Sequence, residues 1–263
     1  AKRAFNERWI DVYETQGKRA GGYSWGSYDT SPYILINYNG TPRDVSVTAH
    51  ELGHSLHSYF THQNQPPIYG EYSSFVAEVA AIFNEILLEE YQLQHAVSVE
   101  VKLALLNTQI DNLRGTLFRQ VMFADFEQQM HLRVQAGAPL TADTLGELYR
   151  STFQRYWGPT LVQDEVNGVY WAHVPHFYMD HYVFRYATSY CAAVALAEDV
   201  LAGKFGARER YLTFLKSGSS KYPLELLKDA GVDLTTKAPI EAALMRFERL
   251  TSEFAGLQAE VTK

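Results

Sequence analysis

The chain has 263 residues, of which 46% are hydrophobic and 20% are charged, and 30 acidic against 23 basic side chains give it a net charge of −7. This composition excludes an intrinsically disordered chain, and the acidic balance argues against a nucleic-acid-binding surface, which needs an excess of basic residues. A single cysteine, Cys191, cannot form an internal disulfide, and no stretch approaches 18 uninterrupted apolar residues. We therefore expect a cytoplasmic protein without nucleic-acid or membrane partners.

The first 18 residues carry an apolar stripe. Phe5, Trp9, Ile10 and Tyr13 stand at the three-and-four spacing of a helix that packs on a core. The pattern predicts an amphipathic helix that ends before the Gly-Gly pair at 21–22.

The next segment is different in kind, because aromatic and β-branched residues fill positions 33–38 between Pro32 and an Asn-Gly turn. This composition predicts one or two strands with turns, and it is the strongest β signal in the chain.

From residue 44 onward the spacing is helical. Asp44 is expected to cap the N-terminus of a helix that runs to a turn at 63–67. Further helices are expected at about 72–90, 96–135, 143–156, 180–202, 207–216, 222–229 and 239–260. Since no internal repeat or linker interrupts this order, the sequence predicts one mainly helical domain over residues 1–263 with a small β-sheet.

Residues His50, Glu51 and His54 form the pattern HExxH, a signature of zinc metalloproteases. On a helix the two histidines lie one turn apart on the same face and can bind one ion. Glu51 is held beside the metal, where its carboxylate can take a proton from water that the metal holds. The competing interpretation is a helix with two structural histidines, although only roughly 0.02 chance matches are expected in such a chain. We expect one zinc ion, and a catalytic zinc requires a third protein ligand.

The third ligand is expected from the following helix. Glu78 stands in the apolar run FVAEVAAIF, where a buried carboxylate is costly without a cation; the alternative is a solvent-facing glutamate. Glu85 lies seven residues later on the same face and is expected to hydrogen-bond a ligand histidine, or else to be an exposed charge. His57 shares the face of His54 and is interpreted as a support of the metal ligands or as a core histidine, because Glu78 is the better zinc ligand.

The segments TAHELGHSLHSYF and FVAEVAAIFNE together resemble the M3 peptidases, and within them the oligoendopeptidase F branch. Four further stretches resemble motifs of that branch and occur in the same order as in the family: YSWGSYDTSPYILINYNG, FRQVMFADFE, VPHFYMDHYVFRYATSY and SGSSKYPLELLKDAGVDL. The resemblance covers nearly the whole chain. It implies a zincin-type catalytic domain, a zinc-dependent endopeptidase acting on short peptides, with His50, His54 and Glu78 as ligands and Glu51 as general base.

In this family a histidine and tyrosines downstream of the metal helices stabilise the tetrahedral intermediate and bind the substrate backbone. The matching residues are His176 and Tyr178, expected to be catalytic, and Tyr182, expected to bind substrate. An imidazolium or phenol that donates to the developing oxyanion contributes a few kcal/mol in a water-poor site. The competing interpretation is aromatic packing, and Phe184 stands where relatives have tyrosine.

The strand from Tyr33 to Tyr38 resembles the edge strand along which the family binds its substrate, so Tyr33 and Ile34 are expected to contact the peptide. An unpaired edge hydrogen-bonds an extended peptide whatever its side chains. The competing arrangement is a strand that is paired on both sides.

Members of the family are considerably longer, and their N-terminal half closes a channel over the zinc. The resemblance therefore implies a C-terminal catalytic part, whose partners are oligopeptide substrates and the N-terminal part of the same protein. Two alternatives stay open: an inactive peptide-binding fragment that keeps the metal site, and a metallocarboxypeptidase with the same ligands.

Overall fold

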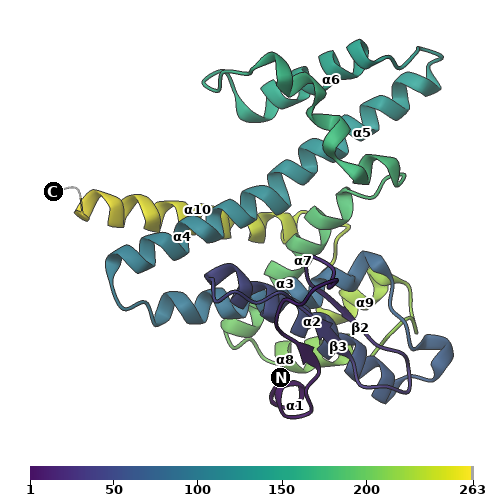
Figure 1. The fold of residues 1–263 in the computed structure, drawn as a ribbon, viewed down its shortest axis with the longest axis vertical. Coiled ribbons are helices and arrows are strands. Elements are labelled where there is room, and N and C mark those ends of the chain that lie inside the picture. The colour runs from purple at the N-terminus through teal and green to yellow at the C-terminus, as the bar shows by residue number, and fades with distance from the viewer. Residues whose placement is uncertain (262–263) are drawn as a thin grey trace. The chain divides into compact units, whose positions relative to one another are not determined.

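The computed structural model describes residues 1–261, which divide into two compact units. The first unit contains residues 1–110 and the described residues from 189 onward, and the second contains residues 111–188. Helices dominate both units (Figure 1), so the prediction of a mainly helical fold with a small sheet is confirmed. The prediction of one domain over residues 1–263 stays a prediction. Every helix among residues 1–261 is too short or too polar to span a bilayer.

The first unit combines three short strands with helices of very different length. Its elements are α1 (Lys2–Asn6), β1 (Ile10–Asp11), β2 (Tyr23–Trp25), β3 (Tyr33–Leu35), α2 (Pro42–Asn64), the 3₁₀ turn η1 (Pro67–Tyr69), α3 (Ser74–Gln94), α8 (Ala207–Leu215), α9 (Pro223–Ala230) and α10 (Ala238–Val261). Two further helices, α4 (Val99–Leu113) and α7 (Phe184–Leu201), have residues in both units.

The prediction of a helix over the first 18 residues is wrong beyond Asn6. Arg8 has a left-handed backbone with φ of 56°, and the chain then enters β1. Trp9 is buried beside the sheet, where its carbonyl accepts the N–H of Ile34 at 2.6 Å. Pairing with a strand far along the chain thus outweighs the local helical spacing, because short apolar runs satisfy both periodicities.

The three strands are ordered β1, β3, β2, so β3 occupies the centre of the sheet. It pairs in parallel with β1 and antiparallel with β2, with Ile34 opposite Ile10 on one side and Ser24 on the other. The expectation that β3 is the substrate-binding edge is therefore wrong, since its backbone groups are used by two neighbours. Among the described strands β2 is an edge, and it lies against α2.

Helix α2 begins earlier than the sequence analysis predicts. Thr41 is its N-cap, and its hydroxyl accepts the N–H of Asp44 at 3.3 Å. Asp44, expected as the cap, is instead the third helical residue, and its carboxylate accepts the N–H of Thr41 at 2.9 Å. Pro42 favours this start, because its fixed φ suits the first helical position.

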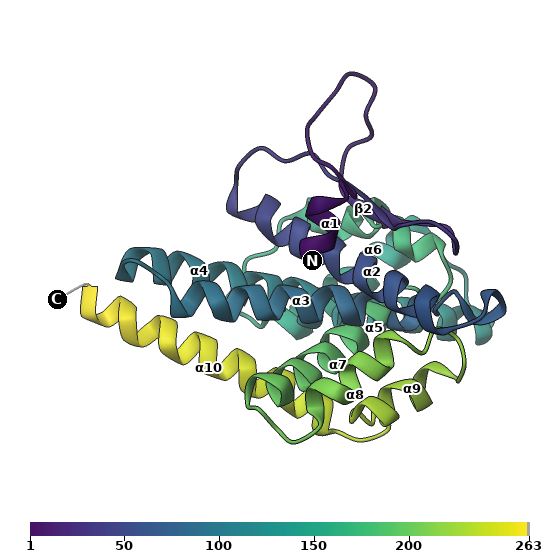
Figure 2. The same ribbon diagram turned by 90° about the horizontal axis from the view of Figure 1, so that it is seen from below.

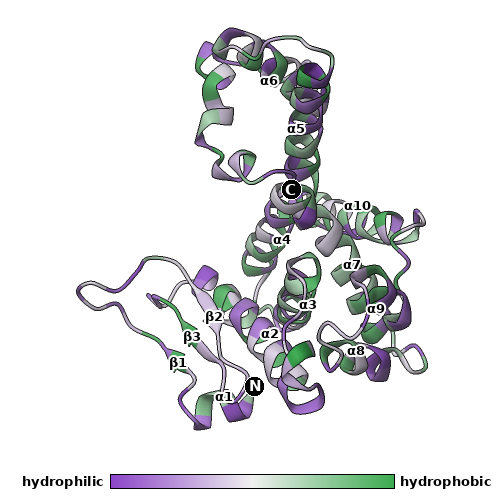
Figure 3. Ribbon diagram, turned by 90° about the vertical axis from the view of Figure 1, so that its right-hand side faces the viewer, coloured by the Kyte–Doolittle hydropathy of each residue, from purple (hydrophilic) through white to green (hydrophobic). Residues whose placement is uncertain are grey.

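Helix α3 is the centre of the first unit. It lies between α2 on one side and α7 and α8 on the other, while the sheet covers the far side of α2 (Figures 2 and 3). The ring of Phe83 on α3 stacks on Tyr211 of α8 at 3.7 Å, and Ser189 of α7 donates to the carbonyl of Phe75 at 3.0 Å. A helix covered on both sides must be apolar nearly all round, which explains the run that flanks Glu78.

The second unit has its own apolar core. Its elements are a π-helical turn (Arg114–Phe118), α5 (Arg119–Gln135), α6 (Ala142–Trp157) and two 3₁₀ segments, η3 (Glu165–His173) and η4 (Pro175–Tyr178). Phe126 of α5 meets Tyr149 of α6 edge to face at 5.2 Å, and both are buried. Helix α7 starts four residues later than predicted, because Asp180 and His181 have positive φ angles of 48° and 52°.

Candidate metal centre

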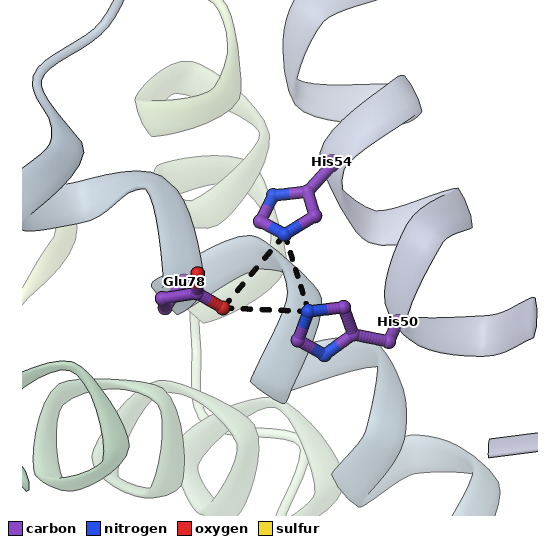
Figure 4. A group of neighbouring side chains, drawn as sticks. All are labelled: His50, His54 and Glu78. Atoms are coloured by element: carbon purple, nitrogen blue, oxygen red, sulfur yellow. Dashed lines mark hydrogen bonds and ion pairs between the residues drawn. The ribbon is translucent and has the colours of Figure 1, made fainter. Parts of the chain in front are cut away.

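Helices α2 and α3 bring three potential metal ligands to one point. His50 and His54 project from α2 toward Glu78 of α3 (Figure 4). The two Nε2 atoms lie 3.2 Å apart, and Oε2 of Glu78 lies 3.4 Å from that of His50 and 3.7 Å from that of His54. All three side chains are partly buried. Two imidazoles and one carboxylate with a side open to solvent make the ligand set of a catalytic zinc site, so the residues present fit that ion.

A glycine between the two histidines allows this convergence. The α-carbon of Gly53 faces the backbone of α3 so closely that a β-carbon there would lie 2.5 Å from the carbonyl oxygen of Ala80. One turn away, the amide of Asn84 donates to the carbonyl of Ala49 at 3.3 Å. Gly53 was not among the predicted site residues, although a glycine inside a long helix often has a packing reason.

The second ring nitrogen of His50 has a carboxylate partner of its own. Nδ1 of His50 lies 3.3 Å from Oε1 of Glu85, two helical turns beyond Glu78. A carboxylate at Nδ1 fixes the tautomer in which Nε2 is free to bind a metal. The structure thus places Glu85 where the sequence analysis expects it.

The imidazoles and carboxylates of the centre strongly perturb one another's pKa values. Burial lowers the pKa of His50, but Glu85, Glu78 and Glu51 outweigh this effect and raise it to about 9. Burial and the neighbouring His50 lower the pKa of His54 to about 3, and burial raises that of Glu78. A metal ion would replace the proton that these carboxylates hold on His50.

Glu51 lies beside the three ligands in a pocket of about 370 Å³, which strand β2 and Glu78 also line. Its side chain is buried, and among the described residues Oε2 has no hydrogen-bond partner. Burial and the nearby carboxylates raise its pKa to about 7 against the opposing effect of His50. Gly22 packs against the other carboxylate oxygen, Oε1, since a β-carbon on Gly22 would lie only 3.2 Å from that atom. A buried carboxylate oxygen that accepts no hydrogen bond from the protein can take up a proton or bind a polar ligand.

His57 is not part of the converging group. It is fully buried, its ring stacks on Tyr72 at 3.7 Å, and it also contacts Phe214. The hydroxyl of Tyr72 donates to the carbonyl of His54 at 3.4 Å, so Tyr72 links the ring of His57 to the centre. Its role as a support of the ligands stays a prediction.

The predicted oxyanion residues belong to the second unit. The ring of His176 stacks on Tyr182 at 5.2 Å, and its Nε2 lies 3.2 Å from the hydroxyl of Tyr186. Tyr178 is 73% exposed. Tyr186 was missed, although Tyr182 and Tyr186 stand four residues apart in a segment predicted to be helical, and such a pair shares a face. The roles of these residues in chemistry stay predictions.

The two predicted substrate residues of β3 differ in access. Ile34 is fully buried and its backbone is paired on both sides, so it cannot contact a peptide as expected. Tyr33 is 45% exposed and its ring meets Tyr23 of β2 edge to face. Strand β2, rather than β3, lines the pocket that holds Glu51.

Comparison with known proteins places this geometry in a family. The curated relatives include Oligopeptidase PepF of Bacillus subtilis, 46% identical over 99% of this chain and 39% of its own length. An oligoendopeptidase F homolog of Lactococcus lactis is 45% identical over 97% of this chain and 43% of its own length. The chain therefore spans about 40% of the length of these relatives.

Solved structures agree in fold. A crystallised oligoendopeptidase-F from Enterococcus faecium superposes with a TM-score of 0.72 at 39% identity, covering 82% of this chain and 39% of that one. A protein from Chlamydophila abortus superposes with a TM-score of 0.88 at 42% identity, covering 97% of this chain and 43% of its own. The family described as Peptidase family M3 matches residues 1–246. The chain therefore belongs to peptidase family M3, with oligoendopeptidase F proteins as its relatives.

Proposed function

We propose that the chain is a zinc-dependent endopeptidase that hydrolyses short peptides. The observation that carries this proposal is the convergence of His50, His54 and Glu78 beside a buried carboxylate oxygen of Glu51 that has no hydrogen-bond partner among residues 1–261. The names of the relatives, oligopeptidase and oligoendopeptidase, support the substrate class.

A zinc ion held by the three ligands would polarise the scissile carbonyl and lower the pKa of a water molecule, which becomes a strong nucleophile once it loses a proton. Glu51 accepts the proton of that water and delivers it to the nitrogen of the leaving amine. Burial brings its pKa to about 7, which suits a group that must both accept and return a proton near neutral pH. Glu85 holds His50 in the tautomer that presents Nε2.

Strand β2 supplies a surface for the peptide backbone. It is an edge of the sheet, and Tyr23, Ser24 and Trp25 line the same pocket as the metal ligands. An extended peptide that pairs with this edge is recognised through its backbone, which permits many side chains. His176, Tyr178 and Tyr182 are proposed to donate to the oxyanion and the substrate backbone, and Tyr186 joins them because its hydroxyl contacts His176.

The test is hydrolysis of a quenched fluorescent peptide by the 263-residue chain. A chelator should abolish cleavage, and zinc should restore it. Glu51→Gln should lower the rate by at least about 10²-fold, because general-base catalysis contributes that much. Glu147→Gln, a matched change on an exposed face of α6, should leave it unchanged. Full activity of Glu51→Gln would remove the assigned role.

A second candidate is a peptide-binding fragment without turnover, which the short span of about 40% of the relatives' length favours. It predicts that the zinc-loaded chain binds a peptide and leaves it intact. Mass spectrometry of the products separates the remaining alternative, since a carboxypeptidase releases single C-terminal residues and an endopeptidase cuts within the peptide.

A further inference from the structure

The second unit contains another group of metal-ligating side chains, formed by Glu127, His131 and His181. One ligand atom from each lies within 4.8 Å of the others. Glu127 and His131 are four residues apart on α5 and therefore share a face, and His181 comes from the turn that precedes α7. All three belong to one compact unit, separate from the residues of the first metal centre.

Glu127 is the buried member of this group, with 1% of its surface exposed. Its Oε1 accepts the backbone N–H of His181 at 2.9 Å. A carboxylate can accept about four hydrogen bonds. Burying a carboxylate that accepts only a few of them costs free energy unless a cation lies close to it. The nearby acid on α5, Asp125, forms an ion pair with Arg155, whereas Glu127 has two histidines beside it.

The two imidazoles are already arranged side by side. The rings of His131 and His181 stack with centroids 4.2 Å apart and planes at 27°, and both residues are partly exposed to solvent. His181 reaches this position through a left-handed backbone, with φ of 52°, that follows another at Asp180. Such backbone persists only where the surroundings favour it strongly.

We propose that Glu127, His131 and His181 bind a second divalent transition-metal ion, with zinc as the expected species. Imidazole and carboxylate donors suit this class of ion, and solvent can occupy the remaining position. Ligand atoms around a tetrahedral zinc lie about 3.4 Å apart, so ligand atoms that lie up to 4.8 Å apart need to approach by at most about 1.4 Å, which side-chain rotation can supply. A bound ion would fasten the turn at 179–183 to α5.

The experiment separates this site from the first centre. Zinc itself is the probe, titrated into the metal-free 263-residue chain against a chromophoric chelator. The variant His50→Ala/His54→Ala, which lacks two ligands of the first centre, should still bind one zinc ion per chain. Adding His181→Ala or His131→Asn to this background should weaken the remaining binding at least about tenfold. The matched control in the same unit is His173→Ala, an exposed histidine, which should leave the affinity unchanged.

Two further readouts keep the test independent of peptidase activity. Cobalt added to the His50→Ala/His54→Ala chain should give visible d–d absorption that is absent after His181→Ala. Glu127→Gln retains an acceptor for the N–H of His181 but removes the charge, and it should weaken zinc binding while circular dichroism reports an unchanged fold. The proposal is overturned if the His50→Ala/His54→Ala chain binds no zinc at micromolar concentrations, or if its affinity is the same with and without His181.

Discussion

Replacement of Gly53 by alanine is expected to push α2 and α3 apart and to take Glu78 away from the two histidines. A β-carbon at Gly53 would lie 2.5 Å from both the carbonyl oxygen of Ala80 and the α-carbon of Ala81. These are backbone atoms of α3, so no side chain can rotate to make room. The helix that carries Glu78 must therefore move.

The size of the movement follows from the contact distance. An ordinary contact of a β-carbon begins at 3.4 Å, so the separation must grow by about 0.9 Å, the difference from 2.5 Å. Overpacking of this kind costs about 1–3 kcal/mol of unfolding free energy. A displacement of about 1 Å in a catalytic site can lower the rate by about 10²-fold.

Three measurements test the expectation: urea unfolding, zinc affinity by competition with a chelator, and cleavage of a quenched peptide by the zinc-loaded chain. Gly256→Ala is the matched control, because a β-carbon there meets nothing within 4 Å in helix α10. It should keep the zinc affinity and stabilise the helix by up to about 1 kcal/mol. If Gly53→Ala unfolds at the same urea concentration and binds zinc as tightly as the parent chain, close approach at Gly53 does not set the geometry of the centre.

Three other predictions concern separate parts of the first unit. Glu85→Gln should weaken zinc binding roughly 10–100-fold with little change in stability, because the amide is a poorer partner for Nδ1 of His50; an unchanged affinity in the chelator assay would contradict this role. The guanidinium of Arg246 is buried and lies 2.7 Å from Glu90. Changing Arg246 to Met should lower the free energy of unfolding by about 3 kcal/mol, measured by urea unfolding at pH 7. Burial raises the pKa of Glu90, but the larger opposing effect of the arginines leaves it below its ordinary value. The stabilisation by this ion pair is therefore fully present above the ordinary carboxyl pKa and is lost as the pH falls through the pKa of Glu90 in the folded chain. A loss of stability on the Arg246 change that is equally large at pH 3 would argue against this ion pair. Burial raises the pKa of the Cys191 thiol to about 11, so the native chain should resist a thiol reagent at pH 8 and react fully in denaturant; rapid labelling of the folded chain would refute the burial.

The sequence predicts the long helices, and the convergence of His50, His54 and Glu78, because both depend largely on local spacing. The two histidines of HExxH share a face in any helix, and Glu78 is marked by its apolar neighbours. The capping of α6 by Thr141 and its end at Gly158 also follow from local rules. Each of these features depends on residues that lie within about four positions of each other.

The sheet could not be predicted in the same way. Trp9 and Ile10 fit a helix and a strand equally well, and the pairing with residues 34–38, more than twenty positions later, determines which one forms. Strand order depends on the same long-range pairing. The aromatic composition of β3 identified a strand correctly but could not show that β1 and β2 pair with it on both sides and leave it no free edge for a substrate.

The register of α3 against α2 decides more of the chemistry than the HExxH motif does by itself. Glu78 and Glu85 are seven residues apart, so they stand on one face of α3 and reach the two opposite nitrogens of a single imidazole, that of His50. A shift of α3 by one residue would rotate both carboxylates by about 100° and remove them together. The bond from Asn84 to the carbonyl of Ala49, one residue from each partner, opposes that shift. The proposed third ligand, Glu78, and the carboxylate of Glu85 at Nδ1 of His50 are therefore both positioned by one helix packing, and a change that disturbs this packing should displace both at once.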